Sequence, residues 1–169
     1  ITPRDLARHI QNTDRYFPRL ETIKTGSTSW QLEVVPDVSR DLNFRLTVRD
    51  NELNGGGNSS DDVNLSVNGT AGPFVVNSPN TNVTWNEGSF ATISWDVAGT
   101  TGNGVNAANV DIFLSTDGGD TYPIPLALGV TNDGSHDSVV PGNQGAQNRV
   151  MVRGENHIFF DISDSDFTI

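Results

Sequence analysis

The alternation of apolar and polar residues is the feature that most narrowly restricts the fold, and it is clearest in residues 110–125, VDIFLSTDGGDTYPIP. Within 110–115 every second side chain is apolar, a period of two that indicates a half-buried strand. Asp111 and Ser115 fall on the other, polar face. The Asp-Gly-Gly-Asp sequence that follows tolerates positive φ and bonds to its own backbone, so the chain can reverse there. The segment therefore predicts a β-hairpin.

Residues 115–122 of this hairpin, STDGGDTY, resemble an Asp-box, a turn found in many secreted β proteins. In such a turn the aspartate, here Asp117, ties down the backbone of the turn and is rarely catalytic. The segment therefore indicates the fold and an extracellular location, and it does not indicate a catalytic activity.

The same period of two recurs on both sides of a Gly-Pro break at residues 71–73. Before the break it predicts strands at 30–34, 44–48 and 63–67, and a flexible loop from Asp50 to Asp62. Trp95 alternates with Ile93 and Val97, which makes it a natural core aromatic. Beyond the break, strands are expected at 74–77, 83–85, 91–97, 110–115, 122–128, 135–140, 149–153, 158–160 and 167–169.

Many short strands separated by turn signals predict an all-β fold of Ig-like or fibronectin-like β-sandwiches. Because the Gly-Pro break interrupts strand pairing, we expect two tandem modules, residues 1–70 and 71–169. A short helix is expected only at the start, where Thr2 can act as N-cap and Pro3 as the first helical residue.

Composition excludes several classes of function. The chain of 169 residues has no cysteine, which rules out disulfides, cysteine metal sites and a cysteine nucleophile. Its formal net charge of −11 repels phosphate backbones, so nucleic-acid binding is not expected. No apolar run is long enough for a membrane span, and no signal peptide opens the sequence, so a secreted protein would be represented here by a mature fragment.

The sequence contains a series of characteristic blocks: FRLTVRDN (44–51), SDD (60–62), AGPFVV (71–76), SPN (78–80), ISWDVAGT (93–100), LSTDGG (114–119), NDGS (132–135) and NHIFFDIS (156–163). Taken together, these blocks resemble the non-catalytic C-terminal region of secreted reprolysin-like zinc metallopeptidases of Bacteroidetes, which often use type IX secretion. The resemblance covers nearly the whole chain from Arg15 onward.

The resemblance implies an accessory module rather than the peptidase itself. The peptidase domain of that family carries an HExxH helix, whereas His9, His136 and His157 are isolated here and none is followed by glutamate. It also implies that residues 1–70 match only the C-terminal half of a β-sandwich module. We therefore expect the missing N-terminal strands to come from the rest of the parent polypeptide or from a second chain.

Calcium is the small partner that the sequence favours most. Asp50, Asn51, Asp61 and Asp62 bracket one loop, and Asp117 and Asp120 bracket another; hard oxygen ligands on such loops suit Ca²⁺. The spacing is not that of an EF-hand, and Asn and Asp also cluster in loops because they favour turns. Asp161, Asp164 and Asp166 are expected to form a solvated acidic face.

No enzyme chemistry is expected, because no nucleophile–base or paired-carboxylate arrangement is recognisable in the sequence. We therefore expect a bacterial extracellular or cell-surface accessory module used for spacing, attachment and assembly. One alternative is an adhesin or filament subunit completed by strand addition in trans. Another is a carbohydrate-binding module that would use Trp30, Trp85 or Tyr122 for stacking on a glycan.

Overall fold

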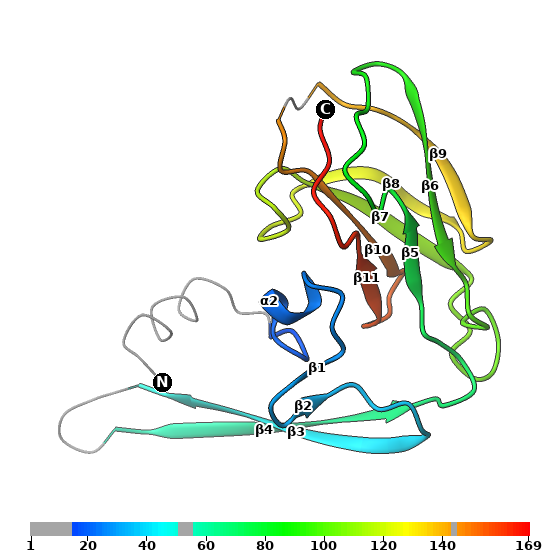
Figure 1. Cartoon of the computed structure of the whole chain (residues 1–169). Helices are drawn as coiled ribbons and strands as arrows, with labels where there is room; N and C mark the ends of the chain where they lie inside the picture. The colour runs from blue at the N-terminus through cyan, green and yellow to red at the C-terminus, as the bar shows by residue number, and fades with distance from the viewer. Residues whose placement is uncertain (1–14, 51–55, 143–144) are drawn as a thin grey trace.

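The computed structural model describes residues 15–50, 56–142 and 145–169, and within them it confirms the predicted all-β fold (Figure 1). The one described helix, α2, is a single turn at Leu20–Ile23. The strands are β1 (Ser29–Trp30), β2 (Glu33–Val34), β3 (Arg40–Arg49), β4 (Asn58–Val67), β5 (Val75–Ser78), β6 (Phe90–Asp96), β7 (Asn109–Ser115), β8 (Ile124–Thr131), β9 (Ser135–Val139), β10 (Arg149–Gly154) and β11 (Phe160–Ile162).

Two antiparallel sheets after residue 74 pack face to face as a β-sandwich. One has the strand order β11-β10-β7-β8 and the other β5-β6-β9. Alternate apolar side chains of both sheets meet between them, as the period of two predicts. Trp95 is buried there, which confirms its predicted place in the core. The buried cluster consists of Val76, Ile93, Trp95, Val110, Ile112, Leu114, Val150, Val152 and Phe167.

A buried polar network closes one end of this core around Asn132. The indole N–H of Trp95 donates to Asn132 Oδ1 at 2.8 Å. The amide of Asn132 in turn donates to Thr100 Oγ1 and to the Ala107 carbonyl, each at 3.0 Å. Every side chain in the network is therefore satisfied, a condition that buried polar groups must meet to avoid a desolvation penalty.

The predicted hairpin at 110–125 forms, but its first strand, β7, is buried on both faces. The alternation predicts that Asp111 and Ser115 lie in solvent, whereas both are buried. Asp111 accepts a hydrogen bond from the Gly129 amide at 3.0 Å and pairs with Arg153 at 3.2 Å. The half-buried assignment was wrong because neighbouring strands of the same sheet cover Asp111, and the turn after β7 covers Ser115, whose hydroxyl bonds to Asp117 and Gly119.

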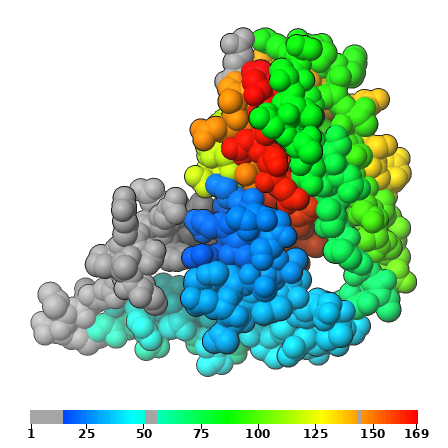
Figure 2. All heavy atoms as spheres, in the orientation of Figure 1, coloured from blue at the N-terminus to red at the C-terminus, as the bar shows by residue number. Residues whose placement is uncertain are grey.

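The segment that begins at Arg15 covers another part of the outer face. Tyr16 packs edge-on against Phe160, with ring centroids 5.5 Å apart. The carbonyl of Lys24 accepts a hydrogen bond from Arg149 at 2.7 Å, and its ammonium pairs with Asp120 at 2.8 Å. In Figure 2 this blue segment lies between the sandwich and the cyan ribbon.

Several predicted strands differ in the structure, and of residues 158–160 only Phe160 lies in a strand, β11. Residues 30–34 form a hairpin of β1 and β2 rather than one strand, since Gln31 adopts a positive φ of 51° and reverses the chain. Residues 83–85 and 167–169 contribute only isolated bridges, Thr84 to Thr168 and Asn148 to Phe167. β4 begins at Asn58, inside the segment predicted as a flexible loop. The predicted helix at Thr2 and Pro3 lies outside the described residues.

Asp161 is not part of a solvated acidic face, which corrects the sequence-based expectation. It lies opposite Val152 in the β10–β11 pair and so shares the core-facing side of the sheet. Its carboxylate accepts a hydrogen bond of 2.7 Å from the Val76 amide of β5, which joins the two sheets at one edge. Burial raises the pKa of Asp161 to about 6, although the hydrogen bonds from the Val76 and Ile162 amides oppose this shift.

Replacement of Asn132 by alanine is expected to lower the free energy of unfolding by about 2–4 kcal/mol. The change removes the acceptor of the Trp95 indole and leaves buried donors and acceptors of Trp95, Thr100 and Ala107 unpaired. Urea denaturation followed by tryptophan fluorescence measures the loss. A variant as stable as the parent would contradict the role given to this network.

Asp161→Asn is expected to stabilise the protein at pH 7 and to have little effect near pH 4. The folded protein holds the proton of Asp161 more tightly than the unfolded chain does, because the pKa is raised in the folded state. This contribution to stability is complete below the unfolded pKa of 3.8 and is lost as the pH rises through about 6. The shift corresponds to roughly 2–3 kcal/mol. The difference in unfolding free energy between variant and parent should therefore grow between pH 4 and 7.

Asp37→Asn is the matched control for this pH series, because Asp37 is exposed and the substitution removes the same charge. Its difference from the parent should stay flat over the same range. A flat difference for Asp161→Asn as well would show that the Asp161 carboxyl is not held protonated by burial.

Candidate functional site

The most unusual surface of the protein is a long two-stranded ribbon formed by β3 and β4, which projects beneath the sandwich (Figure 1). The strands pair antiparallel over ten residues, from Arg40 opposite Val67 to Arg49 opposite Asn58. Within the described part of the chain, neither strand pairs with any other strand. With respect to these residues, both long edges of the ribbon present unpaired backbone donors and acceptors.

One face of the ribbon is polar and consists of matched cross-strand pairs. Arg45 donates to both carboxylate oxygens of Asp62, at 2.6 and 2.7 Å. Next to it, the Asn64 amide donates to Asn43 Oδ1 at 2.8 Å. The hydrogen bond between Arg45 and Asp62 raises the pKa of the guanidinium and lowers that of the carboxyl. A third pair, Ser66 donating to Asp41 at 2.7 Å, completes this face.

The opposite face is apolar, and only its base is covered. Phe44 packs edge-on against Phe17, with centroids 5.3 Å apart, so the N-terminal segment covers the ribbon near the sandwich. Towards the tip the side chains of Leu46 and Val48 are 66% and 60% exposed, and that of Val63, opposite Phe44, is 49% exposed. Alternation along both strands thus produces a sheet face of the kind that packs in a core, with part of it left in solvent.

The predicted calcium ligands around this ribbon are engaged in local hydrogen bonds. Asp50 accepts from the Gly57 amide at 2.8 Å and Asp61 from the Asp62 amide at 3.0 Å. Asp62 binds Arg45, and Asn51 lies outside the described residues. These carboxylates hold the strands and their turn in place, and calcium binding by them stays a prediction.

The second predicted calcium pair lies in the β7–β8 hairpin. Asp117 accepts hydrogen bonds from the Ser115 hydroxyl at 2.7 Å, the Asp120 amide at 3.1 Å, and both the amide and hydroxyl of Thr121 at 2.9 and 2.7 Å. Burial alone would raise the pKa of Asp117, but these hydrogen bonds together lower it. Asp120 pairs with Lys24 instead. In residues 15–50, 56–142 and 145–169, no group of three or more His, Cys, Asp or Glu side chains is placed to hold a metal ion.

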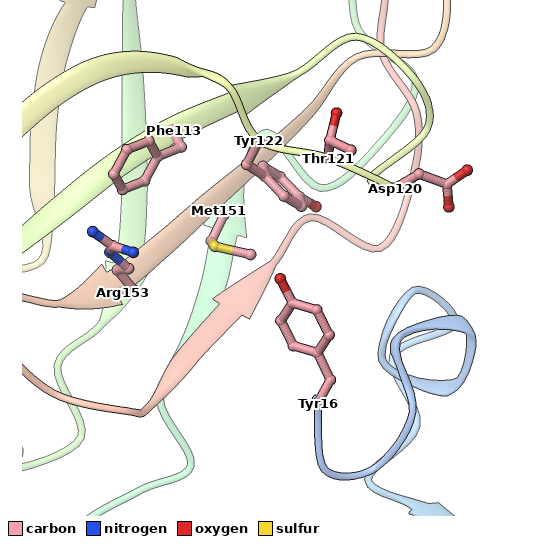
Figure 3. A pocket seen from close by; sticks show the side chains of 7 residues that line it. All are labelled: Tyr16, Phe113, Asp120, Thr121, Tyr122, Met151 and Arg153. Carbon is pink, nitrogen blue, oxygen red and sulfur yellow. The ribbon is translucent and has the colours of Figure 1, made fainter. Parts of the chain in front are cut away.

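A small pocket of about 230 Å³ lies between the N-terminal segment and the outer face of the sandwich (Figure 3). Phe113 and Met151 line it from the sheet, and the Tyr16 ring points into it from the N-terminal segment. The Arg153 guanidinium stacks on Phe113, 4.6 Å from the ring centroid. Tyr122 completes the wall; its buried hydroxyl has no hydrogen-bond partner among the described residues, and burial raises its pKa.

The other two aromatic residues proposed for sugar stacking are covered. The Arg19 guanidinium lies 3.9 Å from the centroid of the Trp30 ring. Trp85 packs against Phe167, with centroids 4.5 Å apart. Tyr122, the third candidate, lines the pocket described above.

Comparisons with known proteins add no identification: no family model matches the chain, and no curated protein or solved structure shows significant similarity to it. The resemblance to reprolysin-associated modules and the count of two modules therefore stay predictions. Among the described helices, none is sufficiently long and apolar to cross a membrane.

The ribbon was visible in the sequence as two alternating strands, but its exposure was not. The alternation of residues 44–48 and 63–67 identified an apolar face on each strand. Register and coverage depend on tertiary contacts such as Phe17 against Phe44, which no local pattern encodes.

Asp117→Asn is expected to lower the unfolding free energy by about 1–2 kcal/mol at pH 7, because an amide cannot accept all the hydrogen bonds that the carboxylate accepts. A pKa lowered in the folded state gives stability that is present above the unfolded pKa of 3.8 and is lost as pH falls through the folded pKa. The deficit of the variant should therefore shrink below about pH 4. Urea denaturation at several pH values measures it.

Asp120→Asn serves as the control in the same turn. Its carboxylate makes an exposed ion pair with Lys24, and loss of such a pair costs less than about 1 kcal/mol. Equal effects of the two substitutions would contradict the turn-anchoring role of Asp117.

Proposed function

We propose that this chain is a non-catalytic, extracellular accessory module of a secreted metallopeptidase or surface protein, used for spacing, attachment and assembly. The β3–β4 ribbon is the surface through which it joins other polypeptide. The observation that carries the proposal is the uncovered part of the apolar ribbon face, formed by Leu46, Val48 and Val63.

The physical argument is that a two-stranded ribbon is marginally stable in water without a covering layer. Full burial of a leucine or valine side chain contributes about 1.5–3 kcal/mol, so covering the tip of this face would stabilise the ribbon substantially. Strands of the parent polypeptide, or of a second chain, supply such a layer. Because Asp61 lies opposite Leu46 on the same face, the covering segment must leave this carboxylate at its rim or pair it with a cation.

The two free edges favour one alternative in particular, an adhesin or filament subunit whose sheet is completed in trans by strand addition. The pocket between Tyr16, Phe113 and Tyr122 favours the other, a carbohydrate-binding module. Aromatic rings beside the Arg153 guanidinium and the Tyr122 hydroxyl offer one apolar surface and several hydrogen-bonding groups, which suits a sugar ring. Glycan binding that disappears in Tyr122→Ala would support this alternative.

Hydrogen exchange of β3 and β4 tests the main proposal, measured on this chain alone and within the full polypeptide that its gene encodes. We expect the ribbon amides to exchange at least about tenfold more slowly in the full polypeptide, since covering the apolar face raises the free energy of local opening. The double variant Leu46→Lys, Val48→Lys should abolish this added protection. The polar-face variant Thr47→Lys should retain it.

Two results would contradict the proposal. Ribbon amides that exchange equally fast in both settings would show that the rest of the polypeptide does not cover this face. Turnover of a peptide substrate by the purified chain would show that the module is catalytic.

A further inference from the structure

We propose that the partner at the ribbon edges is a second copy of this chain, with β3 of one copy pairing antiparallel with β4 of the next. This inference rests on the proposed function in that it takes the ribbon as the assembly surface. It adds the identity of the partner, the edges that meet and the direction of growth.

The charges of the two edges are complementary. β3 carries three arginines and one aspartate, whereas β4 carries two aspartates and no basic residue. Contact between two β3 edges, or between two β4 edges, would bring like charges together, which destabilises directly opposed cross-strand pairs. Contact between β3 and β4 brings opposite charges together. This bias is local, since the chain as a whole carries a charge of −11 and repels its own copies.

The polar pairs of the ribbon can continue across such a contact. Arg45 uses its Nε and Nη2 atoms to bind Asp62 of its own ribbon, and a guanidinium has further N–H donors. The Asp62 carboxylate likewise has lone pairs left for a second donor. If a neighbouring copy adopts the register used within the ribbon, its β4 places another Asp62 opposite the free side of Arg45. The pair of Asn43 and Asn64 can repeat in the same way.

The backbone alternation shows which residues present their amides outward. The Asp50 amide donates to the Gly57 carbonyl, so these residues form a hydrogen-bonded pair at the tip of the ribbon. Such pairs alternate with non-hydrogen-bonded pairs in an antiparallel ladder. Thr47 and Ser60, which face each other, therefore form a non-hydrogen-bonded pair, and their N–H and C=O groups point to the two free edges. Both residues are exposed.

The contact joins two different surfaces, so it does not close on itself as a two-fold dimer does. A heterologous contact generates either a ring or an open filament. Each copy keeps one free β3 edge and one free β4 edge, and the association should therefore proceed beyond the dimer as concentration rises.

Two proline variants of the full chain test this geometry. Proline at an outward-facing position removes an edge donor without breaking the internal ladder. Thr47→Pro blocks the β3 edge, and Ser60→Pro blocks the β4 edge. Sedimentation velocity in about 0.15 M salt, where screening limits the repulsion between copies, follows the assembly over a concentration series. We expect the parent chain to form growing oligomers, each variant alone to remain monomeric, and an equimolar mixture of the two to stop at a dimer.

The other outcomes overturn the inference. Self-association of just one variant would indicate a contact between like edges. Oligomers in both variants, equal to those of the parent, would place the contact on the apolar face instead. A parent chain that is monomeric at every concentration would exclude this partner, while the hydrogen-exchange experiment would still decide the proposed function. The buried Trp95 reports whether each variant keeps its sandwich, and Asn43→Pro with Asn64→Pro repeats the test four residues along each strand if either variant unfolds.

Discussion

A sheet with one apolar face is stable in water when a second layer covers that face, and this requirement organises the whole molecule. Residues 75–169 meet it through two sheets that bury Trp95 and its neighbours between them. The ribbon meets it only near its base, where Phe17 packs on Phe44. The same alternating pattern thus gives a closed core in one part of the chain and an incomplete one in the other.

The N-terminal segment links these two parts because it contacts both. It binds the outer face of the sandwich through Tyr16 and Lys24, and it covers the ribbon through Phe17. This arrangement also explains why Phe113 and Met151 stand on the outer face of β7 and β10, where Tyr16 lines the same pocket. A layer that serves two sheets at once covers each of them only in part, which leaves the pocket on one side and the ribbon tip on the other.

The sequence predicted strands well where alternation was regular and turns were marked by glycine. It failed where the chain reverses at a residue that has no special preference for turns. Gln31 is the example, since no sequence pattern predicts its positive φ. It also failed at Asp161. Asp161 was expected in a solvated acidic face, yet Phe160 and Ile162 share the outer face with Arg153 and Met151, so that Asp161 turns inward to the Val76 amide. A period of two fixes which residues share a face but leaves open which face is covered first.

The candidate site was harder to predict than the fold because it depends on what is missing around a sheet. Asp50 and Asp62 suggested a cation site. In the structure, Arg45 donates a hydrogen bond to Asp62, and the Gly57 amide donates one to Asp50. Charge segregation between two strands becomes meaningful only once those strands are known to be neighbours with free outer edges. In a closed sheet the arginines of β3 and the aspartates of β4 would stabilise one pairing. In an open ribbon the same charges also select which edge of another strand can approach.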